Sequence, residues 1–144
     1  MPGLLSTTAR SFGEVLSSPA CTISRVIGDL LVDLVQYEQA GKPDRLGHGY
    51  LISDYPLTRA VIEEREPRTV FTGDPDADPS ETALLAELGF DSLLMVALEA
   101  EDGAWGLVEV YGDRGHPFDD EQVALARVLA REASERLRQL ERPA

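Results

Sequence analysis

The 144-residue sequence predicts an α+β fold built on a central antiparallel β-sheet of about six strands. Two pairs of β-rich runs, at residues 20–39 and 91–112, are each separated by a short turn signal. Amphipathic helical patterns stand at both ends of the chain. Residues 93–98, "LLMVAL", are all apolar, which indicates that both faces of the sheet are covered.

The N-terminal part predicts a helix followed by a hairpin. Residues 4–18 space their apolar side chains at intervals of three and four, and Pro19 ends the pattern. Strands are expected at 20–27 and 30–39. Gly28 stands at the first central position of the intervening two-residue turn, which favours type II′.

This turn also determines which side chains share a face. It places Ser24 opposite Asp33, and unbroken alternation then puts Tyr37 on the same face as both. Arg25 and Glu109 are charged residues inside apolar strands. They are explained either by a cross-strand ion pair or solvent-facing ends, or by a role as polar anchors for a ligand.

The sequence between the two hairpins predicts shorter elements, and the second hairpin follows them. In order, these are a glycine-rich strand at 45–53, a helix entered through Pro56, a strand at 68–71, a helix at 80–89 ending at Gly89, and the strands of the second hairpin at 91–100 and 105–112.

The last helix, expected at 119–141, has the clearest start signal. Asp119 and Gln122 are spaced as a capping box, and Phe118 with Val123 as a hydrophobic staple. Its apolar stripe reaches nearly to the end of the chain and implies a partner helix: Ala126, Leu129, Ala133, Leu137 and Leu140. Aspartate at position 129 or 137 is therefore expected to weaken dimerisation.

Composition excludes several function classes. The length fits one domain over 1–144, and the net charge of −13 disfavours binding to nucleic acid or an anionic membrane. With a single cysteine, Cys21, and two histidines, neither a disulfide nor a metal site is expected, and Cys21 is interpreted as a small buried side chain or a redox-sensing thiol. The N-terminus has no signal-peptide pattern, so we expect a cytoplasmic protein.

The stretch "TGDPDADPSE" at 72–81 alternates carboxylates as a calcium loop does. The pattern fails where the glycine and the bidentate glutamate of such a loop are required, because those positions hold Pro79 and Leu85. It predicts a helix start instead, with Asp78 as N-cap, Pro79 as first helical residue and Glu81 as the capping-box partner.

The segment "LGFDSLLMVALEAEDGAWGLVEVYGDRGHPFDDEQVALARVLAREASERL" resembles the C-terminal half of GAF domains, which are relatives of PAS domains. The resemblance covers about residues 4–138 and is specific over 89–137. Ala97 stands where the family usually has proline. The stretch "ISDYPLTRAVIEEREP" is also similar to GAF domains of multidomain signalling proteins, especially actinobacterial ones.

The resemblance implies a sensory or regulatory module with a core at about 20–138. Its terminal helices, at 4–18 and 119–141, would lie on one face of the sheet and are expected to dimerise. Short helices and loops on the other face would form a pocket, over which the loop at 72–78 is placed to close.

The chemical subtypes of the family can be tested against these residues. The chain has no asparagine, so it lacks the Asn-Lys-Phe-Asp-Glu motif of cyclic-nucleotide-binding members. Cys21 does not stand where bilin-binding members attach their chromophore, and a lone cysteine cannot support the chemistry of methionine-sulfoxide reductases. His48 is the one candidate haem ligand, and a surface or structurally bonded histidine is the alternative. We therefore expect no cofactor.

The candidate ligand-binding residues are aromatic, apolar or charged side chains expected near the pocket, for which plain core packing is the alternative. They are Tyr37, Tyr50, Tyr55, Arg59, Phe71, Leu84, Leu88, Met95 and Glu109. No motif such as GxSxG supports a catalytic arrangement, so we expect no enzyme.

Two functions follow as hypotheses. One is a homodimeric sensory domain that binds a small molecule or a partner domain and signals through its terminal helices. The alternative is a degenerate module without a ligand that acts as a dimerising spacer for an output domain in a longer protein.

Overall fold

The computed structural model describes residues 2–39 and 49–141. The elements are α1 (Pro2–Val15), β1 (Ala20–Ile27), β2 (Leu30–Glu38), β3 (Gly49–Leu51), the 3₁₀ turn η1 (Ile52–Asp54), α2 (Pro56–Glu64), β4 (Arg68–Phe71), α3 (Pro79–Leu88), β5 (Ser92–Ala100), β6 (Gly103–Gly112) and α4 (Asp120–Glu141). The six strands form one antiparallel sheet in the order β3-β2-β1-β6-β5-β4, as expected for the predicted fold class.

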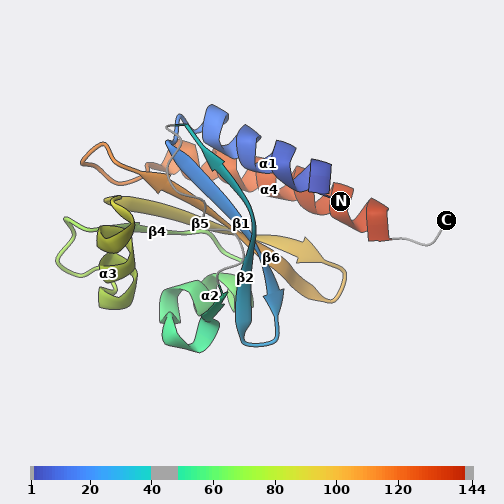
Figure 1. Ribbon diagram of the computed structural model, residues 1–144, viewed down its shortest axis with the longest axis horizontal. Coiled ribbons are helices and arrows are strands. Elements are labelled where there is room, and N and C mark those ends of the chain that lie inside the picture. The colour runs from blue at the N-terminus through green and yellow to red at the C-terminus, as the bar shows by residue number, and fades with distance from the viewer. Residues whose placement is uncertain (1, 40–48, 142–144) are drawn as a thin grey trace.

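The helices divide between the two faces of the sheet. Figure 1 shows α1 and α4 side by side and antiparallel across one face, here called the terminal-helix face. The shorter α2 and α3 lie on the other side, here called the α2/α3 face. Within the described residues no helix is long and apolar enough to cross a membrane.

The central strands are buried on both faces, as the apolar run at 93–98 predicts. Leu94, Val96 and Leu98 belong to the apolar core cluster under α1 and α4, here called the terminal-helix cluster. Leu93 and Met95 belong to the apolar core cluster under α2 and α3, here called the α2/α3 cluster. Alternate side chains of one strand therefore enter different cores, because successive side chains of a strand point to opposite faces.

Local signals set most element boundaries. Gly28 has φ 61° and Asp29 does not have a positive φ, which agrees with a type II′ turn. The expected capping box is present: Asp119 Oδ1 accepts from Gln122 N at 2.8 Å, and Gln122 Oε1 accepts from Asp119 N at 2.9 Å. The expected strand at 45–53 differs, since residues 45–48 lie outside the described residues and residues 52–54 form η1.

The partner helix that the stripe of α4 implies is α1 of the same chain. Ala126, Ala133 and Leu137 are buried in the terminal-helix cluster together with Phe12 of α1. Leu137 is 1% exposed, so an aspartate there would disrupt the core of one chain, and the expected effect on dimerisation stays a prediction.

Gly106 provides a test of the sheet register. It pairs with Arg25 across β1 and β6, and a Cβ added to it would lie 2.3 Å from the backbone oxygen of Ser24. Gly106→Ala is expected to lower the free energy of unfolding by about 1–3 kcal/mol in urea denaturation, as overpacking in a closed core does. Gly3→Ala is the matched control, since its Cβ would meet no atom within 4 Å. An equal stability of the two variants would contradict this register.

Candidate functional site

A small hollow opens on the α2/α3 face, between the sheet and the start of α2 and α3. It encloses about 350 Å³ including its mouth, and its interior space of about 20 Å³ is enough for roughly one water molecule. Its lining is Leu31 of β2, Tyr50 of β3, Ile52 of η1, Tyr55 before α2, Thr58 of α2, Glu81 and Leu84 of α3, and Glu109 and Tyr111 of β6.

The structure brings part of the predicted set to this hollow. Tyr50, Tyr55, Leu84 and Glu109 line it. Met95 lies just beneath, because its Sδ is 3.4 Å from Oγ1 of the lining residue Thr58. Leu88 packs against the same core cluster without lining the hollow.

Tyr37 lies on the opposite face from the one expected. Ile23 pairs with Val35 and Ser24 with Asp33, so Leu34 is an extra residue in β2 and forms a bulge. The bulge reverses the alternation, and Tyr37 packs against the terminal-helix cluster. The prediction that Tyr37 shares a face with Ser24 and Asp33 is therefore wrong beyond the bulge.

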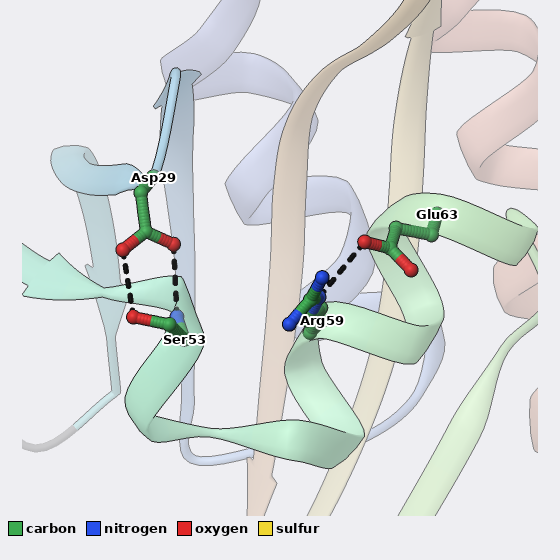
Figure 2. Close-up of polar contacts among 4 residues, drawn as sticks. All are labelled: Asp29, Ser53, Arg59 and Glu63. Atoms are coloured by element: carbon green, nitrogen blue, oxygen red, sulfur yellow. Dashed lines mark hydrogen bonds and ion pairs between the residues drawn. The ribbon is translucent and has the colours of Figure 1, made fainter.

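Arg59 and Phe71 also lie away from the hollow. Figure 2 shows Arg59 on the outer side of α2, where its Nε donates to Glu63 Oε1 at 2.8 Å and its side chain is 58% exposed. Phe71 stands on β4, the edge strand opposite to β3, beside Gly73. The expected inward arginine is thus absent from the lining of the hollow in the described residues.

The mouth of the hollow is positioned by a clamp that the sequence did not predict. Asp29, in the β1–β2 turn, accepts from Ser53 N at 2.9 Å and from Ser53 Oγ at 2.7 Å, as Figure 2 shows. Asp29 O also accepts from Ile52 N at 2.8 Å. These bonds hold η1 against the turn, and so place the flanking Tyr50 and Tyr55, whose rings meet edge to face at 6.1 Å.

Glu109 is the central titratable group of the site. It alternates with Leu107 and Tyr111 on β6, and all three point to the α2/α3 face. Glu109 is 6% exposed, and Tyr111 Oη donates to its Oε2 over 3.4 Å, a long hydrogen bond. Phe90 holds the Tyr111 ring by stacking at 5.0 Å.

Burial raises the pKa of Glu109 to about 8, and the nearby carboxylates of Glu81 and Asp33 add to the increase. Burial also raises the pKa of Tyr111 well above its usual value, with Glu109 as the next cause. At neutral pH the Glu109 carboxyl is therefore mostly protonated.

Glu81 departs from its predicted role as a helix cap. Asp78 is the N-cap as expected and accepts from Ser80 N at 2.9 Å. Glu81 is 1% exposed and accepts instead from Thr58 Oγ1, so it joins α3 to α2 beside the hollow. Burial raises its pKa. The sequence signal is ambiguous, because a third-position glutamate fits either a cap or an inward acid.

The other charged strand residues are satisfied elsewhere. Ser24 Oγ donates to Asp33 Oδ1 at 2.7 Å, and neither residue is part of the lining of the hollow. Arg25 does not pair with Glu109: its Nη1 donates to Trp105 O at 2.9 Å and its guanidinium lies 4.6 Å from the Trp105 ring centroid. Trp105 belongs to the terminal-helix cluster, so Arg25 is also turned away from the hollow.

The remaining predicted groups do not join the site. Cys21 is fully buried in the terminal-helix cluster, and this burial raises the pKa of its thiol, which makes the thiol unreactive. Residues 72–78 are not part of the lining, so the expected lid does not cover this hollow. His48 lies outside the described residues. Across the described residues no group of three or more His, Cys, Asp or Glu is arranged to hold a metal.

The buried Glu109 makes stability depend on pH in a defined direction. Its folded-state pKa of about 8 lies above the ordinary 4.5. The contribution of the protonated carboxyl to the free energy of unfolding is therefore complete below pH 4.5 and is lost as the pH rises through 8. Glu109→Gln is expected to raise the free energy of unfolding at pH 9 by on the order of 5 kcal/mol, with little change at pH 4.5. Urea denaturation at both pH values measures this.

Glu101→Gln, in the exposed β5–β6 turn, is the control and should keep the wild-type pH dependence. If Glu109→Gln has the same pH dependence as the wild type, Glu109 is not the buried acid described.

Comparison with known proteins agrees with this architecture. The sequence model of the GAF domain matches residues 2–137, which is nearly the whole chain. No curated protein matches.

Several solved structures share the fold at low sequence identity. The chromophore-binding domain of the bacteriophytochrome RpBphP3 from R. palustris has a TM-score of 0.83 at 13% identity, covering 97% of this chain and 56% of that chain. The phycocyanobilin-bound GAF domain of a cyanobacterial phytochrome has a TM-score of 0.83 at 14% identity, covering 96% and 84%. The cyanobacteriochrome receptor PixJ has 0.80 at 16%, covering 97% and 96%. The present chain thus spans about half of the RpBphP3 domain, and it belongs to the GAF domain family.

Proposed function

We propose that the protein is a non-catalytic sensory or regulatory GAF domain that binds a small ligand in the hollow on the α2/α3 face. The observation that carries this proposal is the hollow itself, where polar groups of Thr58, Glu81, Glu109 and Tyr111 converge within an otherwise apolar lining. Such convergence is typical of ligand sites, because buried polar groups are costly unless they are satisfied.

The central strands provide a route from the ligand to the terminal helices. β6 presents Glu109 to the hollow and Val110 to the core under α1 and α4. A ligand that shifts β6 therefore acts directly on the packing of both terminal helices. In a longer cytoplasmic signalling protein, these helices would pass the change to an output domain as a population shift between two packings.

A ligand-free spacer is the second candidate, and the small size of the hollow favours it. Side chains of the α2/α3 cluster fill most of this face, and the interior space admits only about one water molecule. The two candidates differ in whether compounds enter the hollow.

Fragment binding followed by NMR tests the ligand proposal. Leu84 and Leu88 stand one turn apart on α3, and only Leu84 lines the hollow. Fragments should perturb resonances of Tyr50 and Tyr55, and Leu84→Trp should abolish these changes by filling the mouth, whereas Leu88→Trp should preserve them. Binding that both variants retain equally, or no binding to the wild type, would support the spacer.

We further propose that the domain forms a homodimer across the outer surface of α1 and α4. A groove between these helices is lined in part by Leu4, Leu129, Glu132 and Arg136. Val128 stands on α4 one turn before the lining residue Glu132 and is 56% exposed. An exposed apolar side chain beside a helix–helix groove is suited to packing against a second helix pair.

The dimer is tested by light scattering after size-exclusion chromatography. Val128→Asp is expected to raise the dimer dissociation constant at least tenfold, because it would place a charge in the apolar contact. Ile27→Asp, at the tip of the β1–β2 hairpin, is the matched control at a residue 58% exposed. A monomeric wild type, or equal effects of the two variants, would overturn the dimer.

A further inference from the structure

Glu109 has an unused hydrogen-bond acceptor that faces the hollow. Its Oε2 has the long contact to Tyr111 Oη, and its Oε1 has no hydrogen-bond partner among the described residues. Among those residues, Asp91 Oδ1 is the one fully enclosed side-chain atom that lacks a partner. Glu109 Oε1 is therefore not sealed in the core, and it is reached through the hollow that Glu109 lines.

The charges around this acceptor favour a cation. Glu81 also lines the hollow, and Asp33 lies close enough to act on Glu109 electrostatically. The described lining has no lysine, arginine or histidine. Arg25 and Arg59 are both engaged elsewhere, with Trp105 and Glu63 respectively. Ionised carboxylates at Glu81 and Asp33 would repel an anionic ligand and attract a cation.

The size of the interior selects among cations. Space for about one water molecule admits an ammonium group, which is of similar size, but not a planar guanidinium. At the mouth, the half-buried rings of Tyr50 and Tyr55 meet edge to face. Aromatic faces near an entrance attract organic cations and cover an apolar chain.

We propose that the hollow binds the primary ammonium group of a small organic amine, with one N–H donated to Glu109 Oε1 and the apolar chain leaving past Tyr50 and Tyr55. This assignment rests on the proposed function, since it names the ligand class of the same hollow. Glu81 contributes a second negative charge near the ammonium group while it keeps its bond to Thr58.

Binding should release a proton. The Glu109 carboxyl is mostly protonated at pH 7, and an ammonium ion binds the ionised carboxylate more strongly than the neutral acid. The protonated carboxyl and the free ammonium ion therefore give the ammonium–carboxylate pair and one proton in solution. A neutral or anionic ligand has no such effect.

Three probes of similar size test the assignment: n-butylammonium, 1-butanol and butyrate, titrated into the full chain at pH 7 and followed by NMR of the tyrosine resonances. Only n-butylammonium should bind, in about the millimolar range expected for so small a ligand. Glu109→Gln should weaken n-butylammonium binding at least tenfold, and the surface control Glu101→Gln should leave this binding unchanged.

Calorimetry in two buffers of different ionisation enthalpy should show close to one proton released by the wild type and none by Glu109→Gln.

The outcomes separate the ligand class from the site. If 1-butanol binds as tightly as n-butylammonium, or if Glu109→Gln leaves amine binding unchanged, the ammonium assignment is overturned and the hollow remains a ligand site. If none of the three probes binds, the ammonium assignment is also overturned. If in addition no fragment perturbs Tyr50 or Tyr55, the proposed ligand-binding function fails with it.

Discussion

The pairing of β6 with β1 and β5 is the constraint on which the other features depend. These strands are buried on both faces, so each side chain must enter either the core under α1 and α4 or the core under α2 and α3. A slip of one residue would exchange Glu109 with Val110 and place a carboxylate beneath the terminal helices. The close approach of Gly106 to Ser24 O resists such a slip, because no larger residue fits there.

This arrangement concentrates unfavourable electrostatics on one face. Glu81, Asp33 and Glu109 are each at most 7% exposed, and all belong to the α2/α3 side. Two of them are partly compensated, Asp33 by Ser24 and Glu81 by Thr58, whereas Glu109 has only the long bond from Tyr111. Perturbed pKa values cluster at functional sites, and this is the face on which we propose that a ligand binds.

Both faces of the sheet are closed by apolar clusters. The terminal-helix face is closed by a continuous apolar cluster that joins α1, α4 and the central strands. The α2/α3 face also has an apolar cluster, which includes Val61 of α2 and Leu85 of α3, and polar contacts add to it, namely the Asp29–Ser53 clamp and the Thr58–Glu81 bond. β6 contributes to both sides, with Glu109 at the hollow and Val110 in the cluster under α1 and α4.

Local rules were enough to predict the fold: the type II′ turn at Gly28, the capping box at Asp119 and the double-sided burial of 93–98 all follow from neighbouring residues. The GAF resemblance was carried by residues 88–137, which include the capping box and the apolar run, and by residues 52–67. The site was predicted only in part, since the bulge at Leu34 moves Tyr37 to the other face and the phase of α2 turns Arg59 outward. Sequence by itself determined the order and type of most elements and the pairing within the two hairpins, because these depend on turns, caps and periodicity, whereas the pairing of β1 with β6 joins segments far apart in the chain. Tertiary structure alone decided which acids and tyrosines meet, because that depends on packing between residues far apart in the chain.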